Sequence, residues 1–375
     1  MGLLWAGLGL AVLAALLLLA ALIATRRRVR RISQALNTIA QSVRPRIVRN
    51  QSHHAQQVAL VVNPSKELAD HVVATVRRIC REAALPEPLV FETSIEDPGT
   101  GQAQAAIAAG ADVVCAAGGD GTVRAVAKAM LETGVPMAIL PTGTGNLLAR
   151  NLKLPLTSIE EAMAVALGGQ EQHIDVGWAT VIEAASHHPL DGKIRAATTG
   201  DRQLFLVIAG LGFDAIMVAE ANDTLKRRMG WLAYFLVALR HLHDQRTPCT
   251  ITIDNRAPQT TKMRTAMVGN CGLLPGNLTL LPQASIDDGV LDVAVIDTRI
   301  GMVGWTQLFG EVLWQGAGKR PKYAPRIGTI DCATATRVTI RTEAGQLAQV
   351  DGDPMGQVVE LECRVDPGAL LVRAV

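Results

Sequence analysis

The sequence lacks the patterns that mark a metal-stabilised or disulfide-stabilised protein. Its six cysteines are scattered, and none of them forms a C-x-x-C pair. The neighbouring histidines at 53–54 and 187–188 have no partner ligands at metal-binding spacing. We therefore predict reduced, mostly buried thiols, and neither a zinc site nor a disulfide framework.

Acidic residues are missing from the first 50 positions, which contain eight arginines. The formal net charge of the whole chain is only +2, so the remainder of the chain is mildly acidic. A broad nucleic-acid-binding surface requires a basic face on the folded part of a protein. We therefore expect no nucleic-acid partner.

Charged side chains are also missing from residues 2–25. As a helix this stretch would be about 36 Å long, more than the roughly 30 Å of a bilayer core. It is too long for a signal peptide and lacks the charged front end of one. We therefore predict a transmembrane anchor over residues 1–25 and a basic juxtamembrane segment and linker over residues 26–55.

The arginines between Arg26 and Arg31 follow this apolar run directly. By the positive-inside rule they predict a single-pass membrane protein whose remaining chain is cytoplasmic. They would also face an anionic phospholipid surface, although topology alone is enough to explain them.

Residues 56–170 alternate between short apolar runs and segments with apolar residues at helical spacing. The expected strands cover residues 58–62, 89–91, 113–114 and 136–140, and helices are expected up to about residue 84, near 102–109 and over 123–133. This alternation predicts a parallel α/β sheet, whose ligands would lie beyond the carboxyl ends of the strands.

Two glycine-rich turns follow strands of this predicted sheet. The first is Gly118-Gly119-Asp120-Gly121-Thr122, and the second is Pro141-Thr142-Gly143-Thr144-Gly145-Asn146. Each opens a helix, so each would point free backbone N–H groups at an anion, and together they predict a grip on a triphosphate. A carboxylate at Asp120 would repel phosphate unless a cation or a hydroxyl proton lay between them, which favours a nucleotide site with Mg²⁺ or a general base. A helix N-cap is the bland alternative for Asp120.

Short strands separated by turns begin at about residue 171. They predict a second, mostly antiparallel domain over residues 171–356, with helical segments at about 214–243 and 302–316. The C-terminal segment, residues 357–375, is expected to pack back on either domain. The expected strands cover residues 204–209, 249–254, 263–268, 278–281, 291–295, 337–341 and 347–350.

Three further motifs lie in this second domain. The run from Gly210 to Ala215 could pass for a dinucleotide fingerprint, but no strand ending in an acid follows about 20 residues later. One acidic loop contains Asp287, Asp288 and Asp292, and a solvated turn is an equally good interpretation of it. Asp351 and Asp353 end a strand and would share a face if extended, which suits a metal-bound general base pair.

The order of these motifs resembles the diacylglycerol kinase catalytic-domain family. This family includes bacterial diacylglycerol kinases and sphingosine kinases and is distantly related to NAD kinases and phosphofructokinases. The resemblance covers roughly residues 55–370 and rests on the two glycine turns and four later motifs: Ile174-Asp175-Val176-Gly177, Gly210-x-Gly212-Phe213-Asp214, Asp288-Gly289-x-Leu291-Asp292 and Val350-Asp351-Gly352. It implies an NAD kinase/phosphofructokinase-like nucleotide domain and a β-sandwich domain, between which ATP and substrate meet.

The resemblance also implies an activity and a set of site residues. The activity is transfer of the ATP γ-phosphoryl group to a hydroxyl of diacylglycerol or a related lipid, with ATP and Mg²⁺. Asp351 would be the general base, Asp120 and Asp353 would lie beside it in the catalytic site, and Asp120, Asp288 and Asp292 would bind metal. The implied nucleotide-binding residues are Asn63, Thr93, Gly118, Gly119, Gly121, Thr122, Thr142, Gly143, Thr144 and Asn146.

The chain departs from the family pattern at two places. The family commonly follows GGDGT with a hydrophobic residue, Asn and Glu, whereas this chain has Val123-Arg124-Ala125. It commonly has Glu where this chain has Asp353, whose side chain is shorter by one methylene, or about 1 Å of reach. These departures leave a non-catalytic lipid- or nucleotide-binding relative as one alternative. An NAD-kinase-like enzyme is the other, although the expected anchor and the missing Asn-Glu after GGDGT argue against it. A homodimer is one of the oligomeric states that the sequence leaves open.

Overall fold

The computed structural model describes residues 55–66, 68–185, 196–212, 247–274, 278–279, 281–298 and 328–375. These residues belong to one compact unit. The helical segments expected at about 214–243 and 302–316 lie outside the described ranges.

The membrane anchor expected over residues 1–25 and the arginines from Arg26 to Arg31 also lie outside the described residues. In the part of the chain that the structure describes, no helix is both long enough and apolar enough to cross a bilayer. The expected fold class is therefore corrected to the α/β half and the β-sandwich half that the described residues form, and no described helix supports its transmembrane part. The expected single-pass membrane localisation is corrected on the same finding, since no described helix could cross a bilayer, and neither prediction is carried further.

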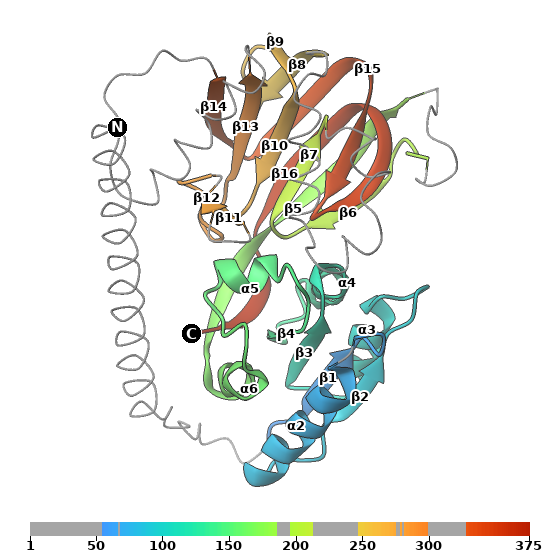
Figure 1. Cartoon of the computed structure of the whole chain (residues 1–375), viewed down its shortest axis with the longest axis vertical. Helices are drawn as coiled ribbons and strands as arrows, with labels where there is room; N and C mark the ends of the chain where they lie inside the picture. Colours follow the sequence, from blue (N-terminus) through green and yellow to red (C-terminus); the bar gives the residue numbers. More distant parts are fainter. Residues whose placement is uncertain are drawn as a thin grey trace, which may run out of the picture. The chain divides into compact units, whose positions relative to one another are not determined.

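A four-stranded parallel sheet forms the α/β half, as the alternation of apolar runs and helical segments predicts. Its strands pair in the order β4-β3-β1-β2 (Figure 1). Every residue of β1, β3 and β4 is buried, as expected for parallel strands covered on both faces. The strands are β1 (Val58–Val62), β2 (Leu89–Glu92), β3 (Val113–Gly118) and β4 (Met137–Pro141).

Helices cover both faces of this sheet. Ala59 and Val61 of β1 share one apolar cluster with α3 and α4, whereas Leu60 and Val62 share another with α2 and α6. Successive side chains of a strand point to opposite faces, so one continuous apolar run can serve both layers. The helices are α2 (Ala69–Glu82), α3 (Thr100–Ala108), α4 (Asp120–Met130), α5 (Leu147–Asn151) and α6 (Ile159–Gly168).

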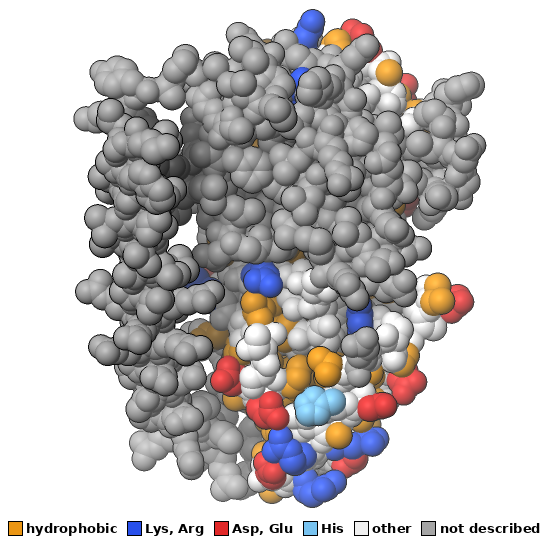
Figure 2. Space-filling model, in the orientation of Figure 1, with side chains coloured by type: hydrophobic (Ala, Val, Ile, Leu, Met, Phe, Trp, Pro, Cys, Tyr) orange, Lys and Arg blue, Asp and Glu red, His pale blue; other side chains and the backbone are white. Residues whose placement is uncertain are grey.

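The outer surface of the α/β half mixes charges of both signs. Acidic and basic side chains interleave on the face of this half that Figure 2 shows. Arg78 of α2 pairs with Glu82 and with Glu160 of α6, each at 3.2 Å. Such exposed pairs contribute little to stability, but the mixture leaves no patch of a single sign among the described side chains of this face.

The second half is a mostly antiparallel β-sandwich around its own apolar core. The long strands β5 and β16 run from the sandwich into the α/β half (Figure 1), and β16 pairs in parallel with β4 through Val372 and Met137. The strands are β5 (Gln170–Ala184), β6 (Arg202–Phe205), β7 (Ile208–Leu211), β8 (Thr247–Ile253), β9 (Gln259–Met263), β10 (Thr265–Gly269), β11 (Leu273–Leu274), β12 (Leu278–Thr279), β13 (Leu291–Thr298), β14 (Gly328–Ala335), β15 (Arg337–Val350) and β16 (Asp353–Ala374).

The strand expected over residues 204–209 is interrupted. It forms β6 and β7, which are separated by Leu206 and Val207. The N–H groups of both residues donate to the carboxylate of Asp351 instead of to a neighbouring strand. This long-range acceptor breaks a strand that the local apolar pattern predicts as continuous.

Gly177 of β5 lies opposite Phe205 of β6, whose side chain is fully buried. A Cβ atom added to Gly177 would overlap the Phe205 ring. We expect Gly177→Ala to lower the free energy of unfolding by about 1–3 kcal/mol, because an added methyl group in a packed core forces neighbouring side chains or backbone out of their preferred positions. Urea unfolding measures this, with Gly168→Ala as the control, since a Cβ at Gly168 meets nothing within 4 Å. Equal midpoints for the two variants would contradict the packing argument.

Candidate active site

The two glycine turns lie against each other at the carboxyl ends of neighbouring strands. Gly118, at the end of β3, is in register with Pro141, at the end of β4. The N–H of Thr142 donates to the carbonyl of Gly118 at 3.4 Å. A Cβ atom on Gly143 would lie only 2.7 Å from Cα of Gly119, so this close approach of two backbones requires glycine.

Asp120 connects the two turns. It is the first residue of α4, and the capping position before it is Gly119, which gives no side-chain cap. Its carboxylate instead accepts a 2.6 Å hydrogen bond from the N–H of Leu147, the first residue of α5. Burial raises the pKa of Asp120 to about 6, the hydrogen bond from Leu147 opposes this shift, and the nearby Asp351 adds to it. The carboxylate therefore caps the helix of the second turn.

The polar side chains of the turns face in different directions. Asn146 has a left-handed backbone (φ 48°), and its amide closes the second turn on itself: Oδ1 accepts from the N–H of Gly143 and Nδ2 donates to the carbonyl of Gly143. Thr122 is buried beneath Gly118. Thr144 is exposed. The Oγ1 atom of Thr142 is buried without a hydrogen-bond partner among the described residues.

Asn63 and Thr93 occupy the carboxyl ends of β1 and β2. The N–H of Asn63 donates to Ala117 of β3, and the N–H of Thr93 donates to Val62. Oδ1 of Asn63 accepts hydrogen bonds from the backbone and hydroxyl of Ser65. Asn63 therefore shapes the turn after β1, next to the end of β3 where the first glycine turn begins.

Lys66 follows this turn and was not expected as a site residue. Its Nζ atom lies 3.9 Å from the position that a Cβ atom would take on Gly119. A flexible cation beside a glycine turn is well placed to meet phosphate oxygens. The available signal was a lysine directly after a strand-ending Asn-Pro turn at the ligand edge of the sheet.

Asp351 lies in the turn between β15 and β16, and its carboxylate is held by three backbone N–H groups. Oδ1 accepts from Val207 at 3.0 Å and Ile208 at 2.9 Å, and Oδ2 accepts from Leu206 at 2.9 Å. A carboxylate has about four acceptor positions, so one position remains, and it is on Oδ2. Burial raises the pKa of Asp351, while the charge of Arg124 and these hydrogen bonds act in the opposite direction.

The backbone of residues 206–208, which donates to Asp351, is held in place by hydrogen bonds that its carbonyl groups accept. Asn270 is buried, and its Nδ2 atom donates to the carbonyls of Leu206 and Asp175 at 3.2 and 2.8 Å. Its backbone N–H donates to the carbonyl of Val207 at 2.8 Å. Sequence reasoning missed Asn270, since nothing local distinguishes it from an ordinary polar residue after a strand.

Asp353 lies close to Asp351 in sequence but points elsewhere. The backbone between them is not extended, because Asp351 and Gly352 both have positive φ, at 46° and 90°. The Asp353 carboxylate forms an ion pair with Nη2 of Arg124, and Nη1 of Arg124 donates to the carbonyl of Val350 at 2.7 Å. Of the residues expected to lie at the catalytic site, Asp120, Asp351 and Asp353 are brought together here, from both halves of the molecule.

Asp288 lies in a separate acidic loop, and Asp292 lies in β13, the strand that follows it. Asp292 is buried in β13, and burial together with the charge of Asp288 raises its pKa. Oδ1 of Asp288 accepts from the N–H of Val290 at 3.2 Å. The described residues contain no cluster of three or more His, Cys, Asp or Glu side chains arranged for a metal, so the metal role of these two aspartates stays a prediction.

Asp175, in the Ile174–Gly177 motif, accepts hydrogen bonds from two distant segments. It is buried, and its carboxylate accepts from the N–H of Gly289 at 2.6 Å and from the N–H of Gly368 at 2.7 Å. Asp175 therefore joins the acidic loop to the bend in β16.

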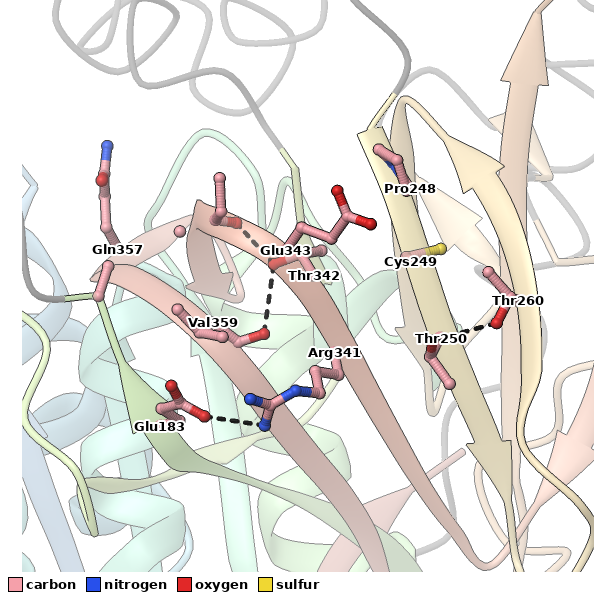
Figure 3. A pocket seen from close by; sticks show the side chains of 13 residues that line it. Glu183, Pro248, Cys249, Thr250, Thr260, Arg341, Thr342, Glu343, Gln357 and Val359 are labelled. Atoms are coloured by element: carbon pink, nitrogen blue, oxygen red, sulfur yellow. Dashed lines mark hydrogen bonds and ion pairs between the residues drawn. The ribbon is translucent and has the colours of Figure 1, made fainter.

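A separate hollow of about 670 Å³ opens in the sandwich between β8, β15 and β16 (Figure 3). Its main charged feature is Arg341, which pairs with Glu183 at 2.8 Å and with Glu360. None of the expected site residues lines this hollow. It therefore belongs to a different part of the molecule from the glycine turns.

Both halves of the chain match family models of known proteins. Residues 57–179 match the family model described as diacylglycerol kinase catalytic domain, and residues 207–374 match the YegS C-terminal NAD kinase beta sandwich-like domain. A Pseudomonas aeruginosa protein named "Probable lipid kinase YegS-like" is 31% identical over 270 residues, which are 71% of this chain and 78% of that protein.

The chain is also similar to a second sequence relative and to a solved structure. A Mycobacterium tuberculosis protein named "Diacylglycerol kinase" is 29% identical over 196 residues, which are 51% of this chain and 57% of that protein. The crystal structure of a diacylglycerol kinase from Bacillus anthracis superposes with a TM-score of 0.63 at 22% identity, over 86% of this chain and 98% of that chain. At that identity the structural likeness establishes the fold alone.

Proposed function

Because the chain belongs to the diacylglycerol kinase catalytic-domain family, we propose that it transfers the γ-phosphoryl group of ATP to a hydroxyl of diacylglycerol or a related lipid. The observation that carries this proposal is the meeting of Asp351 from the sandwich with Asp120 at the junction of the two glycine turns. A phosphate cradle and a buried carboxylate that can accept a proton are the two parts that phosphoryl transfer needs.

The nucleotide half of the site would bind the phosphates of ATP. Backbone N–H groups of the two turns and the Nζ atom of Lys66, which lies beside Gly119, supply the donors. Asp120 fits Mg²⁺, because it is a largely buried carboxylate that has no ion-pair partner among the described residues and whose pKa is raised to about 6. A divalent cation held there would offset charge on both the carboxylate and the phosphates.

Asp351 would act as the general base. The acceptor hydroxyl oxygen attacks the γ-phosphorus, and its proton passes to Oδ2 of Asp351, the carboxylate oxygen with an acceptor position left. The bond from phosphorus to the bridging oxygen breaks, and ADP leaves with that electron pair. The three backbone hydrogen bonds fix the orientation of the carboxylate, and burial raises its pKa toward that of a better base.

Lys66 provides a test of the nucleotide site. We expect Lys66→Ala to raise the KM for ATP roughly tenfold to a hundredfold, the equivalent of one lost charge-assisted hydrogen bond. The KM for the lipid should change little, because the lysine lies at the phosphate turn. Lys128→Ala is the matched control, since Lys128 is exposed near the end of α4. Equal KM values for ATP in both variants would remove Lys66 from the site.

The activity itself is tested with purified protein, γ-labelled ATP and Mg²⁺. Diacylglycerol and a sphingoid base are offered separately in mixed micelles, and NAD is offered in solution. We expect label in a lipid product. Label in NAD instead would favour an NAD-kinase-like enzyme, and ATP binding without transfer to any acceptor would favour a non-catalytic relative.

A further inference from the structure

The two departures from the family pattern, Arg124 and Asp353, contact each other. We propose that Arg124 is a positioning residue that docks the Asp351 turn (Val350–Asp353) onto α4 and so sets the distance between the general base and the phosphates. This inference rests on the proposed function. A long side chain at 124 and a short one at 353 then form a matched pair, instead of two separate defects in a kinase site.

The geometry of the guanidinium supports docking. The Nη1 atom of Arg124 donates to the carbonyl of Val350 at 2.7 Å, and its Nη2 atom pairs with the carboxylate of Asp353. These partners lie on either side of Asp351 in the chain. A planar group that grips both ends of a turn fixes its position and its orientation, which the single point charge of a lysine cannot do.

Arg124 connects this turn to the phosphate site through α4. It lies four residues after Asp120, so the two side chains project from the same face of the helix, one turn apart. Asp353 is also close to the first glycine turn, since its Oδ2 atom lies 3.8 Å from the position of a Cβ atom on Gly121. Any shift of the turn relative to α4 therefore changes the separation of Asp351 and Asp120.

The exposure of the Arg124–Asp353 ion pair indicates that it should affect the reaction rate more than the stability. The Arg124 side chain is 16% exposed, but that of Asp353 is 59% exposed. An ion pair with one exposed partner contributes little to stability. A misplacement of about 1 Å at a reacting group can lower the rate roughly a hundredfold. Loss of the pair should therefore lower kcat much more than it lowers the melting temperature.

The test compares Arg124→Ala, Asp353→Ala, the double variant and Arg124→Lys. We expect each alanine variant to lower kcat roughly tenfold to a hundredfold, with KM for ATP within about twofold of wild type. The double variant should be no slower than Arg124→Ala, because Arg124→Ala already removes the ion pair that Asp353→Ala breaks. Arg124→Lys should recover part of the rate. Arg337→Ala is the control, since it removes an ion pair with Glu362 on the sandwich surface and should leave kcat unchanged.

A direct contact between Arg124 and the phosphates of ATP would give a different pattern. Arg124→Ala would then raise the KM for ATP, and Asp353→Ala would retain wild-type activity, because its removal would free the arginine. Either result overturns the docking proposal. A double variant slower than both single variants by the product of their effects would overturn it as well.

Hydrogen–deuterium exchange separates this proposal from the proposed function. The N–H of Gly352 donates to Gln349 at 2.7 Å, and that of Asp351 donates to Ile208 at 2.8 Å. We expect these amides to exchange faster in Arg124→Ala and Asp353→Ala than in wild type and in Arg337→Ala. Faster exchange in a protein that phosphorylates no acceptor would refute the function and leave the docking contact intact. Unchanged exchange would refute the docking contact whatever the activity.

Discussion

Asp351→Asn is expected to reduce phosphoryl transfer by roughly 10²–10⁴-fold, the usual contribution of a general base. The asparagine oxygen can still accept from Val207 and Ile208, but its NH₂ group would replace the Oδ2 atom that accepts from Leu206. The variant therefore loses the proton acceptor and also sets two donors against each other. The loss should appear in kcat at saturating ATP and lipid.

Two controls separate loss of the base from loss of the fold. ATP binding to Asp351→Asn should stay within a fewfold of wild type, because the glycine turns are in the other half of the molecule. Asp70→Asn makes the same chemical change at an exposed position in the first turn of α2 and should leave the rate unchanged. Near-normal turnover by a folded Asp351→Asn protein would remove the general base from the mechanism.

Asp120→Asn is expected to abolish turnover and yet to stabilise the protein at neutral pH. The pKa of Asp120 is raised from an ordinary 3.8 to about 6 by burial, so the folded state holds this proton more tightly than the unfolded state does. Below about pH 4 the carboxyl of Asp120 is protonated in both the folded and the unfolded state, so it does not lower the free energy of unfolding. Stability is lost as the pH rises from about 4 through about 6, and above that the full loss is on the order of 3 kcal/mol.

Asparagine removes this loss of stability and keeps an acceptor for the N–H of Leu147. Without nucleotide or divalent ions, the variant should therefore melt at a higher temperature than wild type at pH 7.5, and the difference should shrink toward zero near pH 4. Adding Mg²⁺ and ATP should stabilise wild type more than the variant. A variant that is less stable than wild type at pH 7.5 would show that the charge of Asp120 is already compensated in the free protein.

The α/β half could be predicted from the sequence because its signals are local. Short continuous apolar runs bounded by turn residues, such as Val58–Val62, are typical of buried strands, and each glycine turn directly follows one. The juxtaposition of the two turns also followed, since neighbouring parallel strands end at the same edge of the sheet. The family resemblance carried by these motifs is confirmed by the two family models and the Pseudomonas relative.

The parts that could not be predicted depend on contacts between distant residues. Asp351 interrupts a strand that lies about 145 positions before it, and Arg124 meets Asp353 across 229 positions. The resemblance implies Asn146 as a nucleotide-binding residue, and the hydrogen bonds of its amide to both backbone groups of Gly143 could not be foreseen from its position. The expectation that Asp351 and Asp353 share a face assumed an extended backbone, whereas two positive φ values in succession send their side chains to different partners.

The most direct test of the proposed lipid kinase activity is a transfer reaction with a total membrane lipid extract. Purified protein, γ-labelled ATP and Mg²⁺ are incubated with the extract, and the labelled product is identified by its mass. We predict that one class of hydroxyl-bearing lipid gains a single phosphoryl group, and that Asp351→Asn makes no such product. A protein that binds ATP but adds phosphate to no lipid in the extract would contradict the proposal.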